Sequence, residues 1–136
     1  MALVKRLNMI VTIISLIGLT GLLPVAKSEP NTNVNLLWCN ENGYAEEDPY
    51  ANSVAYILAD LMNVTPSRQG FDYSTVSPYA TAVSFGHATC NTALSNDDCA
   101  NCLVAAKASV SSSCLNSIGG RVEMVDCAMR YENYPF

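Results

Sequence analysis

The sequence predicts an α+β fold in which two helices pack on a five-stranded antiparallel β-sheet, held by three disulfides. Strand-like and helix-like segments do not alternate strictly along the chain, which is typical of helices packed on an antiparallel sheet. Each helical segment has one apolar face, and the 6 cysteines form an even set in a short chain. These observations predict a single small domain that cross-links stabilise.

The first 28 residues predict a secretory signal peptide. Two basic residues precede an almost entirely apolar stretch, residues 7–25, and Ala26-Lys27-Ser28 then offers small residues for cleavage. The alternative is a signal anchor that stays in the membrane, but glycines and a proline interrupt the apolar stretch and no second one follows. We expect a mature domain of residues 29–136 that is secreted to the extracellular space (the apoplast), without stable membrane insertion.

The predicted mature domain is strongly acidic. The chain has 7 basic and 12 acidic residues, and Lys5, Arg6 and Lys27 lie in the signal, which leaves 4 basic and 12 acidic residues and a net charge of −8. Such a surface repels phosphate backbones and anionic lipids. Nucleic-acid binding and cationic disruption of membranes are therefore disfavoured.

Two segments of the mature domain predict helices. Asp48-Pro49 is a favourable helix start because Asp can cap and Pro fits the first turn. Ser95-x-x-Asp98 forms a capping box that opens the second helix. The apolar face of the first helix comprises Val54, Ile57, Leu58 and Leu61, and that of the second comprises Cys99, Leu103, Ala106, Val110 and Cys114. Strands are expected at residues 33–38, 70–73, 79–89, 121–125 and 128–133.

The cysteines provide the most specific motif. Cys99-x-x-Cys102 alone could belong to a redox or zinc site, but the first expects a βαβ context and the second expects a further ligand pair, whereas the only histidine is His87. The longer spacing Cys90-x8-Cys99-x2-Cys102 resembles the defining motif of the ginkbilobin-type antifungal proteins of seeds. That motif is shared with the ectodomains of plant cysteine-rich receptor-like kinases. Flanking segments also resemble the family: Cys39-Asn40, Gly70-Phe71-Asp72-Tyr73, Phe85-Gly86-His87-Ala88-Thr89-Cys90, Ile118-Gly119-Gly120-Arg121-Val122 and Cys127-x-x-Arg130-Tyr131-Glu132.

The resemblance implies a disulfide pairing and a ligand site. The implied pairs are Cys39–Cys114, Cys90–Cys99 and Cys102–Cys127, one of the fifteen pairings that the sequence alone allows. In the family an Asn, an Arg and a Glu hold mannose, and the matching residues are Asn40, Arg121 and Glu132. These residue types suit sugar hydroxyls, since Asn donates and accepts, Arg donates and ionised Glu accepts.

The spacing of the last two strands predicts a hairpin. With a tight turn at Asp126-Cys127, Arg121 would lie directly across from Glu132, and the polar and apolar side chains would separate onto opposite faces. The same pattern is also typical of a solvated charge ladder with no ligand, in which each pair contributes about 0.2 to 1 kcal/mol.

Other polar residues carry weaker functional signals. His87 has no evident nucleophile or acid partner, and Glu46-Glu47-Asp48 could be a glycosidase pair but more simply forms a solvated loop. No calcium-binding loop of the EF-hand type occurs, and neither a cofactor nor a metal is expected. Asn63-Val64-Thr65 is the only N-glycosylation sequon, and the Pro66 after it disfavours its use.

The sequence and the resemblance together favour a secreted plant defence lectin. It would bind mannose or mannan of fungal cell walls without calcium, inhibit fungal growth and have no enzyme activity, since no nucleophile–base pair is evident. The alternative is an extracellular inhibitor or signalling ligand that acts on a protein target, in which Asn40, Arg121 and Glu132 are merely structural.

Overall fold

The computed structural model describes residues 29–136, so the predicted signal peptide lies outside the described part. The helices and strands follow in the order β1 (Val34–Cys39), α2 (Tyr50–Val64), β2 (Asp72–Val76), β3 (Phe85–Cys90), α3 (Asn96–Ser113), β4 (Gly120–Met124) and β5 (Cys127–Glu132). Two short 3-10 turns, Thr65–Ser67 and Gln69–Phe71, connect α2 to β2. This is the predicted order of strands and helices.

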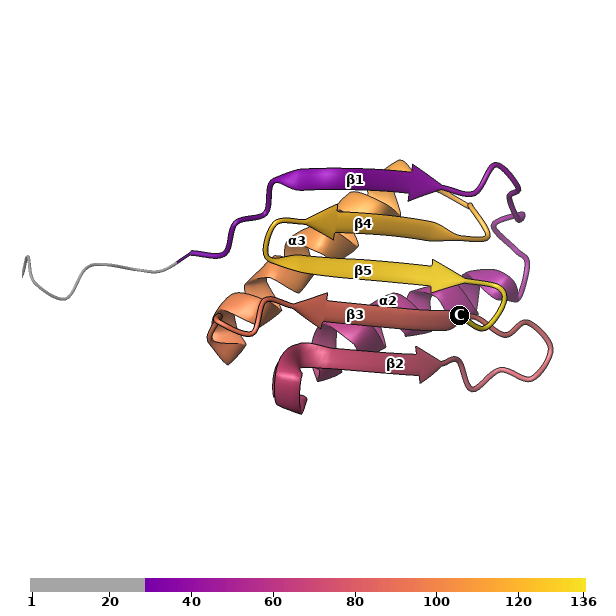
Figure 1. The fold of residues 1–136 in the computed structure, drawn as a ribbon. Coiled ribbons are helices and arrows are strands. Elements are labelled where there is room, and N and C mark those ends of the chain that lie inside the picture. Colours follow the sequence, from indigo (N-terminus) through magenta and orange to yellow (C-terminus); the bar gives the residue numbers. More distant parts are fainter. Residues whose placement is uncertain (1–28) are drawn as a thin grey trace, which may run out of the picture.

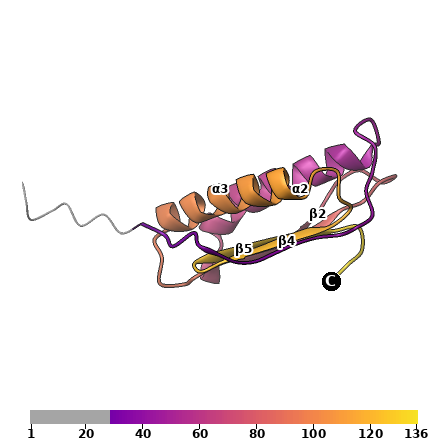
Figure 2. The same ribbon diagram turned by 90° about the horizontal axis from the view of Figure 1, so that it is seen from above.

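The strands form one sheet in the order β1-β4-β5-β3-β2, and every neighbouring pair is antiparallel. Both helices lie against one face of this sheet, and no helix of residues 29–136 covers the opposite face, which we call the open face (Figures 1 and 2). The predicted fold class is confirmed. Within the described residues, no helix combines the length and apolar character that crossing a membrane requires.

The two helices start where the sequence predicts. The Asp48 carboxylate accepts a hydrogen bond from the Tyr50 amide at 2.9 Å. The Ser95 hydroxyl accepts one from the Asp98 amide at 3.1 Å and satisfies an amide that has no partner within α3. All residues of the two predicted apolar faces are buried in one core between the helices and the sheet.

Three disulfides fix α3 to the sheet. They join Cys39 to Cys114, Cys90 to Cys99 and Cys102 to Cys127, the pairs that the family resemblance implies. Because Cys99 and Cys102 lie in α3 and Cys114 directly follows it, the bridges tie this helix to β3, β5 and β1. The sheet is thus cross-linked to α3 at three of its five strands.

The predicted hairpin is present, but its register differs from the prediction by two residues. Arg121 pairs with Arg130, and not with Glu132 as predicted. The turn is formed by Val125 and Asp126, because Cys127 already belongs to β5 and is buried in its disulfide with Cys102. A shift of two residues returns every side chain to its predicted face, so the separation into polar and apolar sides is unchanged.

Two strands, β2 and β3, have bounds that differ from the predicted ones. Gly70 and Phe71 have positive φ angles of 76° and 49° and form a turn, so β2 starts only at Asp72. The predicted strand at residues 79–89 is shorter, since its first part forms the loop between β2 and β3 and the strand itself starts at Phe85.

Candidate functional site

One row of side chains crosses the middle of the open face. The strand registers place Trp38 of β1 opposite Arg121 of β4, Arg121 opposite Arg130 of β5, and Arg130 opposite His87 of β3. Residues paired in this way lie on the same face of a sheet. The row therefore brings together an indole, two guanidinium groups and an imidazole on the face that no helix covers.

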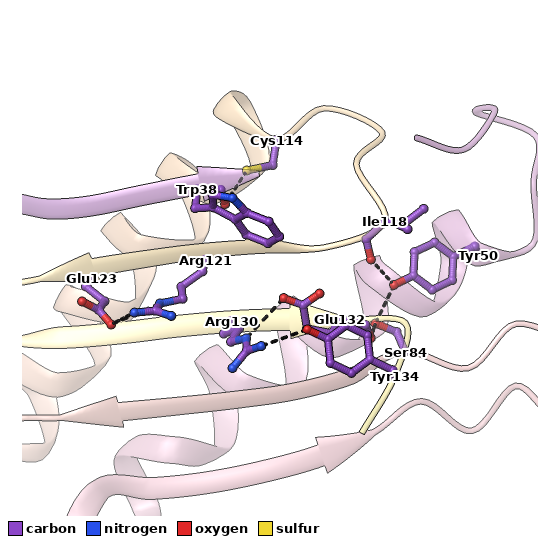
Figure 3. Close-up of polar contacts among 10 residues, drawn as sticks. All are labelled: Trp38, Tyr50, Ser84, Cys114, Ile118, Arg121, Glu123, Arg130, Glu132 and Tyr134. Carbon is purple, nitrogen blue, oxygen red and sulfur yellow. Dashed lines mark hydrogen bonds and ion pairs between the residues drawn. The ribbon is translucent and has the colours of Figure 1, made fainter. Parts of the chain in front are cut away.

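The two arginines hold carboxylates on their own strands. Arg121 donates from Nη2 and Nε to Oε1 of Glu123 at 2.7 and 3.1 Å, and Arg130 donates from Nε to Oε1 of Glu132 at 3.2 Å (Figure 3). Each pair is separated by two residues, so both partners lie on the open face. Arg121 therefore does not bind Glu132 as predicted. The arginine that donates to Glu132 is Arg130.

Glu132 is almost completely buried, although it lies on the open face. Its exposed fraction is 1%, and its second carboxylate oxygen, Oε2, has no hydrogen-bond partner within the described residues 29–136. A Cβ atom at Gly119 would overlap Oε2 and would lie 3.0 Å from Cδ. The absence of a side chain at position 119 therefore leaves the space that this carboxylate occupies.

Two buried tyrosines hold the segment that leads to Gly119. The Tyr50 hydroxyl donates to the carbonyl of Ile118 at 2.6 Å, and the Tyr131 hydroxyl donates to the carbonyl of Ser117 at 2.8 Å. Burial raises the pKa of Tyr50 and, more strongly, that of Tyr131 above the ordinary value. Both hydroxyls thus stay protonated and keep donating at physiological pH.

The C-terminal residues fold back over the open face (Figure 2). Arg130 donates from Nη2 to the Tyr134 hydroxyl at 3.2 Å, and its Cζ lies 4.0 Å from the centre of the Phe136 ring. The tail therefore adds two aromatic rings to the polar centre of the sheet.

Arg121 and Glu132 line one depression of about 290 Å³. Its other lining residues are Leu36, Trp38, Arg130 and Tyr134. The Glu132 carboxylate lies between the Trp38 indole and the Tyr134 ring (Figure 3). Donors, an acceptor and aromatic surfaces thus converge in one place, a composition typical of small-ligand sites.

Asn40 directly follows β1 and is not among the residues that line this depression. Its amide N–H donates to the carbonyl of Gly119 at 2.9 Å, and its side-chain Oδ1 accepts from the Asn42 amide at 2.9 Å. The side-chain NH₂ keeps its donors, since neither bond uses them. Asn40 and Glu132 are thus both linked to Gly119.

The remaining candidates lie apart from the depression or have structural partners. His87 contacts Asp72 at 2.7 Å, and Glu46, Glu47 and Asp48 are exposed residues before α2. Asn63 is exposed near the end of α2, whereas the Thr65 of its sequon is buried and donates to the carbonyl of Leu61 at 2.6 Å. Within residues 29–136 no group of three or more His, Cys, Asp or Glu side chains is arranged to hold a metal ion.

Sequence reasoning did not assign Trp38 or Tyr134 to the site. Trp38 precedes Cys39 in β1, and alternation from Cys39, which faces α3, would have placed the indole on the open face. Tyr134 follows the last strand, and no periodicity indicates where such a tail folds.

Comparisons with known proteins identify what the chain resembles. The salt stress response/antifungal family matches residues 38–134. The antifungal protein ginkbilobin-like protein 1 of Picea glauca is 31% identical over 132 residues, which cover 96% of this chain and 90% of that protein. Antifungal protein ginkbilobin-2 of Ginkgo biloba is 34% identical over 100 residues, which cover 72% of this chain and 74% of that protein.

Solved structures show the same fold. The tandem DUF26 ectodomain of the Arabidopsis thaliana cysteine-rich receptor-like protein PDLP5 matches with a TM-score of 0.69 at 23% identity, and that of PDLP8 matches with a TM-score of 0.63 at 22% identity. Each match covers 76% of this chain but only 51% and 46% of those ectodomains. The chain thus spans about half of each tandem ectodomain.

Proposed function

The chain belongs to the salt stress response/antifungal family, and from that premise we propose that it is a secreted defence lectin that binds mannose or mannan of fungal cell walls. The ligand side chains in this proposal are Asn40, Arg121 and Glu132. The protein acts in the apoplast after removal of residues 1–28, needs no calcium and limits fungal growth by binding.

The observation that carries the proposal is the convergence of two of the few basic side chains at one depression. Residues 29–136 contain only four basic side chains, Arg68, Lys107, Arg121 and Arg130, against 12 acidic ones. Two of the four lie directly opposite each other at the centre of the open face. Like charges directly opposite each other on neighbouring strands destabilise a sheet. Proteins tend to keep such local conflicts at functional sites.

The two arginines also keep unused donors. The Nη1 atom of each guanidinium has no hydrogen-bond partner within residues 29–136, because the bonds to Glu123, Glu132 and Tyr134 use only Nε and Nη2. Sugar hydroxyls are good acceptors for such donors. Arg121 and Arg130 therefore supply the donor side of the site.

Glu132 supplies the acceptor side. Its Oε2 is buried and unpartnered, and a buried acceptor without a partner costs about 1–3 kcal/mol. A sugar hydroxyl that donates to Oε2 relieves this cost. Because the exposed fraction of Glu132 is only 1%, the groups that cover the carboxylate must shift before the sugar can reach it. The NH₂ of Asn40, which takes part in no bond within residues 29–136, would donate to a further hydroxyl.

Exposed apolar side chains support the second candidate, recognition of a protein. Val34, Leu37 and Trp38 of the edge strand β1 are 48%, 42% and 47% exposed. An edge strand with such side chains can pair with a strand of another protein. In this case Arg121 and Glu132 would not determine binding.

An NMR titration of oxidised residues 29–136 with mannose tests the proposal. We expect saturable, mannose-selective shifts at Asn40, Arg121 and Glu132 with a Kd around the millimolar range, about −4 kcal/mol, and no effect of EDTA. Glucose is the specificity control.

Two variants that each remove one positive charge form the matched pair. Arg121→Gln should abolish the mannose-dependent shifts, whereas Lys107→Gln on α3 should retain them. Folded wild-type protein without shifts up to tens of millimolar mannose would refute the lectin function and favour the protein target.

A further inference from the structure

The open face has a second depression beside the first. Its volume is about 180 Å³, and it is lined by His87, Arg121, Glu123, Ala128, Met129, Arg130 and Phe136. Arg121 and Arg130 line both depressions. The two depressions therefore adjoin at the arginine pair, and we call them together the trough.

Both depressions offer the same three kinds of chemical group. The first combines the arginines with the Glu132 carboxylate and the Trp38 indole. The second combines them with the Glu123 carboxylate and the Phe136 ring, which lies 4.0 Å from Cζ of Arg130. Guanidinium donors and carboxylate acceptors suit sugar hydroxyls, and the negative face of an aromatic ring attracts the weakly positive C–H bonds of a sugar ring.

Trp38 is well placed for stacking of this kind. Its exposed fraction is 47%, and the indole N–H has no hydrogen-bond partner among the described residues. Trp38 pairs with Arg121 of β4, and neighbouring strands of a sheet lie about 4.8 Å apart. Both side chains line the first depression, so a sugar there can contact the ring and the guanidinium together.

The trough is longer than a single sugar. Glu132 lines the first depression and Ala128 the second, and four residues of β5 separate them by about 13 Å. A single pyranose ring in the first depression leaves the second one free. Arg121 and Arg130 line both depressions, and no bond within residues 29–136 uses their Nη1 donors.

We propose that the ligand is an oligosaccharide with at least two adjoining sugar units, one in each depression. This inference rests on the proposed mannose binding and extends it. The first unit lies between Trp38 and Tyr134, and the second lies over Ala128 beside Phe136. Arg121 and Arg130 donate to hydroxyls of both units.

Isothermal titration calorimetry with mannose, mannobiose and mannotriose tests the second subsite. Wild-type protein should bind mannotriose at least tenfold more tightly than mannose. A site for one sugar alone would give only a threefold gain, because mannotriose offers it three equivalent units. Ala128→Gln fills the second depression, so it should reduce mannotriose affinity to about that of mannose while changing mannose affinity less than twofold.

Two further variants separate the subsites from the fold. Trp38→Ala removes the stacking surface of the first subsite and should weaken binding of mannose and mannotriose alike. Val104→Gln, at a 53% exposed position on the covering helix α3, is the matched control and should change neither affinity.

The outcomes distinguish this inference from the proposed function. Equal affinities for mannose and mannotriose, with no effect of Ala128→Gln, overturn the second subsite and leave mannose binding intact. Absence of binding by any of the three sugars overturns both.

Discussion

Gly119 illustrates how one missing side chain positions the candidate site. The backbone at Gly119 accepts a hydrogen bond from Asn40, and the space beside its Cα holds the Glu132 carboxylate. We therefore expect Gly119→Ala to displace this carboxylate and weaken its contact with Arg130. Overpacking of this kind costs about 1–3 kcal/mol of unfolding free energy. Chemical denaturation should detect that loss, and mannose titration should show at least tenfold weaker binding.

A double variant provides the control. Glu132→Asp shortens the side chain by one methylene and removes the overlap with the alanine methyl group. The Gly119→Ala/Glu132→Asp protein should therefore be more stable than the sum of the single changes, with a coupling of at least about 0.5 kcal/mol. Its mannose binding should stay weak, because the carboxylate is withdrawn from the depression. Strictly additive stability losses would contradict this role of Gly119.

The residues of the candidate site were easier to predict than their contacts. Arg121 and Glu132 line one depression, whereas mannose binding by Asn40, Arg121 and Glu132 stays a prediction. The burial of Glu132 beside Gly119 and the contribution of Tyr134 depend on the paths of the segment before β4 and of the tail. Neither is encoded in the residue types alone.

Among the elements, the helices were predicted best because their signals are local. The Ser95 cap and the spacing of the buried residues on α3 are visible in the sequence and recur in the structure. The register of β4 and β5 depends on long-range constraints, above all on the burial of Cys127 against α3. An error of two residues leaves the facial pattern intact, so hydrophobic alternation could not reveal it.

The cap of α3 leads to a prediction at this scale. Ser95→Ala removes the acceptor of the Asp98 amide, and we expect a loss of about 1 kcal/mol in unfolding free energy, measured by urea denaturation. Ser111→Ala, at an exposed position of the same helix, is the matched control and should change stability by less than about 0.5 kcal/mol. Equal effects of the two substitutions would exclude a stabilising cap.

At the scale of the whole molecule, the buried tyrosines predict how stability changes at alkaline pH. Burial raises the pKa of Tyr131 and of Tyr50 in the folded state above the value of 10.0 that an unperturbed tyrosine has. The unfolded chain therefore loses these protons first. The stabilisation is complete below about pH 10 and is lost as the pH rises toward the folded-state pKa values.

Thermal melts between pH 7 and pH 11 test this expectation. The melting temperature should vary little up to about pH 9 and fall steeply above pH 10. Tyr131→Phe should cost about 1 kcal/mol at neutral pH, because the bond to Ser117 is lost, but should make the alkaline decline shallower. An unchanged alkaline slope in this variant would show that Tyr131 does not contribute to it.

The position of β5 in the sheet has a consequence for biosynthesis. Among the strands of residues 29–136 it is the last in sequence, yet it lies at the centre of the sheet order, between β4 and β3. Without it, the β1–β4 pair and the β2–β3 hairpin would share no edge. No nascent chain that stops short of Cys127 can therefore complete the sheet, and the partner of Cys102 would also be missing. Assembly of the sheet must therefore wait until β5 has been synthesised, and a chain that terminates before it would expose two separate half-sheets to quality control.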